Sequence, residues 1–385
     1  MTKYRIPFTR IHSTGKELDY LREAVESGQL AGDGRFTQQC ERWLEQTTGC
    51  ARALLVHSGT AALEMAAILA DLTPGDEVIM PSFTFPSTAN AFVLRGAVPV
   101  FVDIEPRTLN IDPEALAAAV TSRTRAIVPV HYAGVACDMD AILSLADRAG
   151  LMVIEDAAQA LLSSHRNRPL GSLGAMAALS FHQTKNVPSG EGGALLVNDP
   201  SLIERAEIVR EKGTNRGRFY RGEVDKYTWV DVGSSYLPGE LISAFLFAQL
   251  QQAEQITKSR IAVWERYHRA LEPLEASGRL VRPAQSTGRE GNAHIYYVLL
   301  QSVVGRAEVI ESLRQRGISA VFHYVPLHSS PAGMRFGRTA GPLPVTDDIS
   351  DRLLRLPIWS DMTDDDVDLV VGSVAAALGV MTTTV

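Results

Sequence analysis

The stretch Ala53-Leu-Leu-Val-His-Ser-Gly-Thr-Ala-Ala-Leu-Glu-Met-Ala-Ala-Ile-Leu-Ala-Asp71 passes from a short apolar run into a run rich in Ala, Leu and Met. The first part, Ala53 to His57, is typical of a buried β-strand, and Thr60 to Asp71 is typical of a helix. The small residues Ser58 and Gly59 lie where the helix would begin. This strand, turn and helix form the unit from which the fold is predicted.

Short β-rich runs and helical stretches continue to alternate from about residue 50 to residue 200. The expected strands are 53–57, 77–80, 98–102, 126–131, 151–154 and 177–181, and the expected helices are 60–71, 88–95, 112–120 and 139–149. Such alternation favours an α/β fold in which a mostly parallel sheet has helices on both faces. Ligands of such folds bind beyond the carboxyl ends of the strands.

The pattern changes after about residue 238. Residues 239 to about 274 are predominantly helical. They are followed by expected strands at 294–300 and 320–325, expected helices at 307–315, about 347–354 and 364–378, and an expected exposed loop at 333–344. We therefore expect a large domain over residues 1–238, which includes an N-terminal segment, and a smaller C-terminal α+β domain over residues 239–385.

The composition excludes several classes of protein. The 385 residues are 45% hydrophobic and 21% charged, a balance that can fill a substantial core. The net charge of -7 argues against a general nucleic-acid binder. Cys40, Cys50 and Cys137 are too few and too irregularly spaced for a disulfide framework or a zinc site, so no metal is expected. The chain lacks a signal-like N-terminus and an apolar run of transmembrane length, which favours a cytoplasmic protein without a membrane partner.

A lysine and an acid follow two of the expected strands. Lys185 ends the stretch Ser180-Phe-His-Gln-Thr-Lys185, which is followed by Ser189-Gly-Glu-Gly-Gly193, and Asp156 follows the apolar run 151–154. A pyridoxal phosphate (PLP) enzyme needs a lysine that forms a Schiff base and a carboxylate that keeps the pyridine nitrogen protonated. The alternatives are an exposed lysine in a polar loop and an aspartate that caps a helix.

Further residues near strand ends fit the same cofactor. If a helical turn follows Asp156, Gln159 lies on the same face and reaches the ring hydroxyl region. Ser180 can give its hydroxyl to the phosphate. The turn at Ser58-Gly-Thr-Ala61 opens a helix whose N–H groups favour an anion, although a plain helix cap has the same pattern. Phe85, in Pro81-Ser-Phe-Thr-Phe85, is the candidate for stacking on the ring; the alternative is that both phenylalanines of this stretch are core residues.

These motifs, together with Asp103 and Gly190-Glu-Gly-Gly193, resemble the DegT/DnrJ/EryC1/StrS aminotransferases. These are fold-type I PLP enzymes that aminate nucleotide-linked keto sugars. The resemblance spans essentially the whole chain. Within the family, several stretches are similar to the transaminases that make dTDP-4-amino-4,6-dideoxygalactose, namely 89–96, 128–137, 210–216, 224–229 and 321–328.

The resemblance implies a role for each matching residue. Lys185 would be the Schiff-base lysine and the proton-transferring base, Asp156 would pair with the pyridine nitrogen, and Gln159 would contact the ring oxygen. The remaining cofactor contacts would come from Phe85 on the ring and from Gly59, Thr60, Ala61 and Ser180 on the phosphate. The family is dimeric, and the partner subunit completes each active site. Where the family usually carries an Asn that reaches the partner's phosphate, this chain has Ser235, whose hydroxyl can donate but reaches less far.

Two groups of residues are candidates for binding the sugar nucleotide. Arg216, Arg218, Arg221 and Lys226, next to Tyr227, form a local basic group that suits a diphosphate; a solvated surface loop is the alternative. The other group comprises His323, Tyr324 and His328, which are candidate sugar-pocket residues. Structural histidines are the alternative for this second group.

The favoured function is transfer of the amino group of L-glutamate to C4 of dTDP-4-keto-6-deoxy-D-glucose. The products would be 2-oxoglutarate and dTDP-4-amino-4,6-dideoxyhexose, with galacto or gluco configuration. Sugar 3-dehydratases of this family carry histidine in place of the lysine, so Lys185 disfavours that activity. Aminohydroxybenzoate synthesis remains an alternative. A non-catalytic PLP-binding regulator is another, although the acidic balance speaks against DNA binding.

Overall fold

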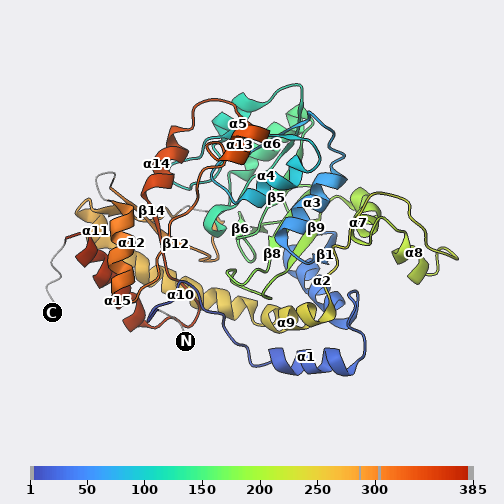
Figure 1. Ribbon diagram of the computed structural model, residues 1–385, viewed down its shortest axis with the longest axis horizontal. Coiled ribbons are helices and arrows are strands. Elements are labelled where there is room, and N and C mark those ends of the chain that lie inside the picture. Colours follow the sequence, from blue (N-terminus) through green and yellow to red (C-terminus); the bar gives the residue numbers. More distant parts are fainter. Residues whose placement is uncertain (1–3, 286–287, 302–304, 380–385) are drawn as a thin grey trace.

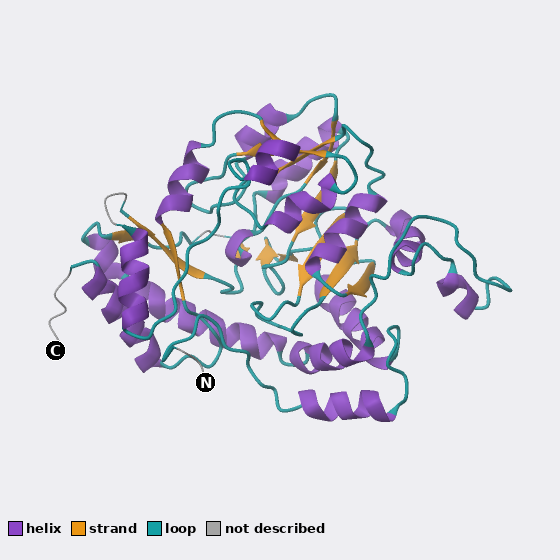
Figure 2. Ribbon diagram, in the orientation of Figure 1, coloured by secondary structure: helices purple, strands orange, loops and turns teal. Residues whose placement is uncertain are grey.

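The computed structural model describes residues 4–285, 288–301 and 305–379. Within them, eight strands form one large sheet at the centre of the molecule (Figures 1 and 2). In spatial order they are β1 (Arg52–Val56), β9 (Gly193–Val197), β8 (Met176–Ser180), β5 (Met152–Asp156), β4 (Thr124–Ile127), β2 (Glu77–Pro81), β3 (Val98–Val102) and β13 (Arg338–Thr339). Strand β9 runs antiparallel to β1 and β8, and the other neighbouring pairs are parallel. The predicted mostly parallel α/β sheet is confirmed.

Helices cover both faces of this sheet, because alternate residues of each strand point to opposite sides. Leu55 of β1 belongs to a core that includes residues of α2 (Arg35–Thr48), α5 (Pro113–Ala119), α6 (Met139–Ala149) and α9 (Glu240–Leu250). Its neighbours Leu54 and Val56 belong to the opposite core, with α3 (Gly59–Leu69), α4 (Pro86–Val93) and α7 (Ile203–Arg210). Helix α1 (Glu17–Glu26) lies against α9.

A second, smaller core lies beside the large sheet. The antiparallel strands β10 (Leu280–Val281), β12 (Tyr296–Leu300) and β14 (Leu353–Leu356) form its sheet. Its helices, on the left of Figure 1, are α10 (Ala253–Ala270), α11 (Glu272–Ala276), α12 (Arg306–Gln315) and α15 (Asp364–Ala377). Helix α9 packs on α1 and α2 of the large unit although it follows residue 239. The domain boundary at that residue stays a prediction.

Short elements complete the described chain. They are η1 (Tyr132–Gly134), β6 (Ser164–His165), β7 (Arg168–Pro169), η2 (Pro200–Leu202), α8 (Arg216–Tyr220), β11 (Arg289–Glu290), α13 (Pro331–Phe336) and α14 (Pro344–Arg352). Strands β11, β6 and β7 form a separate small sheet, and α8 projects from the right of the molecule in Figure 1. No described helix has the length and apolarity needed to span a membrane.

Two expectations for the C-terminal part were wrong, and the end of one expected helix was misplaced. Residues 320–325 do not form a strand, because only Val321 finds a bridging partner, Arg355. The helix expected over 347–354 ends at Arg352, and the leucine-rich run after it pairs with β12 as β14. The exposed loop expected over 333–344 instead contains the end of α13 and all of β13, which adds to the large sheet beside β3. All three outcomes depend on long-range strand pairing, which short apolar or polar runs do not specify by themselves.

Candidate active site

The predicted cofactor residues meet at one edge of the large sheet. Strands β5 and β8 are parallel neighbours, with Asp156 opposite Ala178, so the carboxyl end of β5 lies beside that of β8. Beyond these ends lies a cavity of about 700 Å³. Its lining includes the predicted residues Gly59, Thr60, Phe85, Asp156, Gln159, Ser180, Lys185, His323 and Tyr324. Residues from five separate sequence motifs are thus brought to one site.

Lys185 lies in a tight turn after β8, where its backbone N–H donates to the carbonyl of His182 at 2.8 Å. Burial lowers the pKa of the Lys185 amine from 10.5 to about 8; Asp156 opposes this shift, and the positive charge of Arg355 adds to it. An amine must be unprotonated to act as a nucleophile. The site therefore gives Lys185 a substantial neutral fraction near physiological pH, which an exposed loop lysine would not have.

Asp156 is held by a chain of buried hydroxyl groups. Its Oδ2 accepts a hydrogen bond from Thr88 Oγ1 at 2.7 Å, and Thr88 is itself hydrogen-bonded to Thr84 at 2.8 Å. Its Oδ1 accepts from the N–H of Ala158 at 3.2 Å. Turns rather than a helix follow β5, so Asp156 does not cap a helix. The carboxylate is fixed at the cavity wall, where it can pair with a cationic ring nitrogen.

Gln159 reaches the cavity through this turn rather than through a helical turn. Its Oε1 accepts a hydrogen bond from the N–H of Ala133 at 2.8 Å, and its Nε2 donates to Tyr324 Oη at 3.1 Å. These two bonds define which side of the amide is the donor. They also join the large-domain motif to Tyr324 of the C-terminal part.

The start of α3 and the end of β8 approach closely enough to enclose an anion. The Ser58 hydroxyl accepts from the N–H of Ala61 at 3.1 Å, and Ala61 is buried outside the cavity lining. Gly59, with Thr60, lines the cavity, and a Cβ added to Gly59 would lie 3.0 Å from the Cβ of Ser180. Free N–H groups at a helix start and a nearby hydroxyl favour a phosphate. The residues present therefore fit PLP at both its ring and its phosphate.

The two phenylalanines before α4 lie in different environments. Phe85 is 57% exposed and lines the cavity. Phe83 is fully buried and packs against Tyr132, with 5.2 Å between ring centroids. The core interpretation therefore applies to Phe83 alone, and Phe85 is free to stack on a flat ring.

The sequence profile of the DegT/DnrJ/EryC1/StrS aminotransferase family matches residues 12–375. The chain belongs to this family. It is 36% identical over 370 residues to the spore coat polysaccharide biosynthesis protein SpsC of Bacillus subtilis (strain 168), and the match covers 93% of each chain. Members of the family depend on PLP, and the expected family membership is confirmed.

Solved structures of other proteins share the fold over almost the whole chain. The chain resembles DesV of S. venezuelae, determined in complex with a ketimine intermediate, with a TM-score of 0.87, 30% identity, and coverage of 98% of this chain and 100% of that one. It also resembles 3-amino-5-hydroxybenzoic acid (AHBA) synthase, with a TM-score of 0.89, 28% identity, and coverage of 98% and 99%. The expected fold-type I architecture is confirmed.

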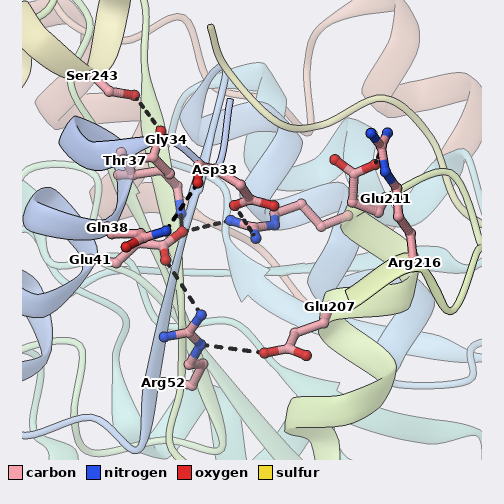
Figure 3. A network of polar contacts seen from close by, with 12 residues as sticks. Asp33, Gly34, Thr37, Gln38, Glu41, Arg52, Glu207, Glu211, Arg216 and Ser243 are labelled. Carbon is pink, nitrogen blue, oxygen red and sulfur yellow. Dashed lines mark hydrogen bonds and ion pairs between the residues drawn. The ribbon is translucent and has the colours of Figure 1, made fainter. Parts of the chain in front are cut away.

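The predicted diphosphate-binding loop lies apart from the cavity within one chain. Arg216 lies 4.0 Å from Glu211 (Figure 3). Its guanidinium also lies over the rings of Tyr220 and Tyr227. Arg221 forms ion pairs with two glutamates of its surroundings, at 2.8 Å and 2.7 Å. The predicted roles of this loop, including Arg216, Arg221, Lys226 and Tyr227, and of Ser235 stay predictions, because none of these residues lines the cavity of its own chain.

The two predicted histidines differ in position. His323 lines the cavity and lies 3.0 Å from Tyr132 Oη through its Nδ1. His328 lies outside the cavity lining, where it contacts Ser82 at 2.8 Å and Asp347 at 3.3 Å. A role for His328 in binding the sugar stays a prediction.

Sequence reasoning missed several residues of the cavity. Thr88 gave no signal of its own, since one threonine in a helical stretch is unremarkable in sequence. His294 lines the cavity and is hydrogen-bonded to Asn186 at 3.0 Å. Arg355 was missed because the helix expected over about 347–354 takes in the first half of its strand, β14, and Arg355 itself was placed in no predicted element. The Arg-Leu-Pro run after that helix was the one available signal.

Proposed function

We propose that the protein is a PLP-dependent aminotransferase that moves the amino group of L-glutamate to C4 of dTDP-4-keto-6-deoxy-D-glucose. The products are 2-oxoglutarate and a dTDP-4-amino-4,6-dideoxyhexose. The observation that carries this proposal is the position of Lys185, whose pKa is lowered to about 8 by burial in the cavity that Asp156 and the start of α3 also line. Family membership supports the transfer of an amino group, and the similarity of five sequence stretches to 4-keto-sugar transaminases supports the acceptor.

The residues of the cavity divide into four contacts with the cofactor. Asp156 holds the protonated ring nitrogen, Phe85 covers one face of the ring, and Gln159 contacts the ring oxygen. Gly59, Thr60 and Ser180 hold the phosphate at the start of α3. When bound, PLP supplies the electron sink that makes the carbon next to the amine acidic.

Lys185 carries out the proton transfer. Its neutral amine takes the proton from the donor's amine-bearing carbon and later returns one to C4 of the sugar. A pKa of about 8 suits both directions, since a base works best when its pKa is close to the working pH. Thr88 keeps Asp156 oriented during both half-reactions through the 2.7 Å hydrogen bond to Oδ2.

We further infer a homodimer in which two copies complete each other's sites. In this arrangement Ser235 and the loop with Arg216, Arg221, Lys226 and Tyr227 reach the cavity of the second copy. The loop projects from the body of the chain in Figure 1, and Tyr227 is 51% exposed. An exposed basic and aromatic loop suits contact with a nucleotide diphosphate.

Synthesis of an aminohydroxybenzoate is the second candidate activity. The fold of the chain is as similar to AHBA synthase as to DesV, so similarity of fold does not separate the two. A non-catalytic PLP-binding protein is excluded if glutamate removes the visible absorbance of the cofactor bound to Lys185. The acceptor must then be established by assay.

The test of the proposal is incubation with dTDP-4-keto-6-deoxy-D-glucose, PLP and L-glutamate, followed by proton NMR of the product. The coupling constants across C3, C4 and C5 assign the amine as axial, in the galacto product, or equatorial, in the gluco product. Lys185→Ala is expected to lose turnover, whereas Lys258→Ala, at an exposed lysine of α10, keeps it. Multiple turnovers by Lys185→Ala, or no sugar amine formed by the wild type, would refute the proposal.

A further inference from the structure

Asn292 joins the turn that carries Gln159 to the segment that leads into β12. It is 1% exposed, and its Nδ2 donates hydrogen bonds to the backbone carbonyls of Gln159 and Leu161, at 2.9 Å and 2.8 Å. Its Oδ1 accepts a hydrogen bond from the N–H of His294 at 3.0 Å. These bonds use both donors of the amide and its oxygen, so the side chain is held in one orientation.

The same segment holds the residue that follows Lys185. Asn186 is buried, and its Nδ2 donates to the backbone carbonyl of Asn292 at 2.9 Å. Its Oδ1 lies 3.0 Å from Nδ1 of His294. Because an amide oxygen can only accept, Nδ1 of His294 carries the proton. Burial lowers the pKa of His294 well below its usual range, and the positive charge of Lys185 adds to this shift, so the ring is neutral.

Asn186, Asn292 and His294 thus form a bridge between the turn of Lys185 and the turn of Gln159. The bridge is anchored from the small core by Arg260 of α10, which donates to the backbone carbonyls of the two residues after Asn292, at 3.2 Å and 2.9 Å. On its other side the packing is close, since a Cβ added to Gly134 would collide with Oδ1 of Asn292. The bridge therefore has little room to shift.

Lys185 and Gln159 contact neighbouring parts of the bound cofactor in the proposed function. PLP is attached to the Lys185 nitrogen through the carbon beside its ring oxygen, and Gln159 reaches that oxygen. Nε2 of Gln159 carries two donors, and Tyr324 Oη uses one of them at 3.1 Å. A hydrogen bond from the other donor makes the ring oxygen less basic, so the proton that this oxygen shares with the Lys185 nitrogen is held less tightly.

We propose that the bridge positions Gln159 against Lys185 and so sets how tightly the Lys185 nitrogen holds its proton in the PLP-loaded protein. Asn292 is its central residue, because it bonds to the turn of Gln159 and to Asn186. Neither Asn186 nor Asn292 lines the cavity, so both are positioning residues that act through their neighbours. The inference rests on the part of the proposed function in which PLP binds to Lys185, and it is independent of the amino donor and of the sugar.

The first experiment measures the pH midpoint of the visible absorbance change of the PLP-loaded protein, without substrates. Asn292→Ala is compared with the wild type and with Asn198→Ala. The Nδ2 of Asn198 also donates to two backbone carbonyls, at 3.0 Å and 2.8 Å. Asn198 follows β9, whose last residue pairs with the first residue of β8, so it lies at the end of β8 opposite to Lys185.

The two variants lose the same kind of hydrogen bonds, so urea unfolding should show a similar loss of stability in both. Only Asn292→Ala should move the midpoint, because only this change frees the turn of Gln159. We expect a rise of about 0.5 to 1 pH unit, the effect of losing one hydrogen bond to the ring oxygen. Asn292→Ser keeps one donor and should give an intermediate midpoint, and it replaces Asn292→Ala in the comparison if the alanine variant does not fold.

The second experiment asks whether Asn292 acts through Gln159. Gln159→Ala alone should also raise the midpoint, and adding Asn292→Ala to it should give little further shift, because the two changes remove the same hydrogen bond. Additive shifts in the double variant would overturn the inference. So would equal midpoints in Asn292→Ala and the wild type, or equal shifts in Asn292→Ala and Asn198→Ala.

Failure of the inference is distinguishable from failure of the proposed function. If loading with PLP gives the wild type no visible absorbance beyond that of Lys185→Ala, the proposed function fails and the inference fails with it. If the wild type shows this absorbance and its pH titration but the Asn292→Ala midpoint does not move, the inference alone is overturned.

Discussion

Replacing Lys185 by methionine is expected to stabilise the cofactor-free protein at neutral pH. The wild-type amine is partly buried, and its pKa falls from 10.5 to about 8 mainly because burial disfavours the charged form, although the nearby Asp156 opposes the shift. Methionine has a similar length and no charge, so it fills the same space without that cost. Lys185, which is needed for activity, should therefore lower the stability of the cofactor-free protein.

The size of the expected stabilisation by Lys185→Met follows from the shift in the pKa of Lys185. Since each pKa unit corresponds to about 1.4 kcal/mol, the fall from 10.5 to about 8 is equivalent to about 3 kcal/mol. Part of the Lys185 side chain is exposed to the cavity, and solvent screening there reduces the expected gain to about 2 kcal/mol. This gain applies below about pH 8, where lysine is protonated in both the folded and the unfolded chain.

The sign of the pH dependence is a second part of the prediction. Between about pH 8 and pH 10.5 the unfolded chain holds a proton that the folded chain has released, so wild-type stability rises with pH. The advantage of Lys185→Met should therefore shrink over this window. Other groups also titrate in this pH window. Their contribution is the same in both proteins, so it cancels when the free energy of unfolding of the wild type is subtracted from that of Lys185→Met.

The assay is urea unfolding of both cofactor-free proteins at one fixed protein concentration, at about pH 7 and again near the upper end of that window. The control is Lys258→Met, at an exposed lysine, whose effect should be small at both pH values. The reasoning is refuted if Lys185→Met is no more stable than the wild type at neutral pH. It is also refuted if the difference in the free energy of unfolding between Lys185→Met and the wild type is the same at both pH values.

Three further changes test the structure around the site. Thr88→Val removes the 2.7 Å hydrogen bond to Asp156 and should weaken PLP binding about tenfold in a spectrophotometric titration; an unchanged affinity would mean that this bond does not orient the carboxylate. Gly193→Ala places a Cβ 2.3 Å from the carbonyl carbon of Ser58 and should lower the free energy of unfolding by about 1–3 kcal/mol, measured in urea; full stability would contradict this close approach. Glu240→Gln removes a buried carboxylate charge that accepts hydrogen bonds from the backbone N–H groups at the start of α2. It should lower the free energy of unfolding in urea by about 1–3 kcal/mol. An unchanged urea midpoint would show that the amide of glutamine caps the helix equally well.

The polar network around the start of α2 also explains why the N-terminal part was hard to interpret from sequence. Glu41 of α2 is buried and bonds with Arg52 of β1, which also lies 3.6 Å from Glu207 of α7 (Figure 3). Buried Arg210 pairs with Glu41 as well, at 2.6 Å. In sequence these four residues are ordinary charged positions. Their partners lie far along the chain, so only folding identifies them as one buried network.

Much of the site could be predicted because its residues follow strands. Asp156 and Lys185 each lie just beyond an apolar run, and parallel neighbouring strands bring their carboxyl ends together. The same reasoning could not separate Phe83 from Phe85, since alternate residues of a short stretch give no sign of which one faces a cavity. Arg355 was beyond reach for a different reason. Its strand pairs with residues almost sixty positions earlier, and the first half of that strand falls within the helix expected over about 347–354.

The sequence by itself determined the alternating strands and helices of the large unit, together with the lysine, the acid and the phosphate turn of the site. These features are local: each strand or helix carries its own hydrophobic period, and each motif occupies a few consecutive residues. Only the tertiary structure decided that Arg355 faces the cavity without a polar partner among the described residues, that Phe85 lines it while Phe83 is buried, and that residues 338–339 extend the large sheet. Those outcomes depend on contacts between distant segments, whose pairing is set by packing of the whole chain.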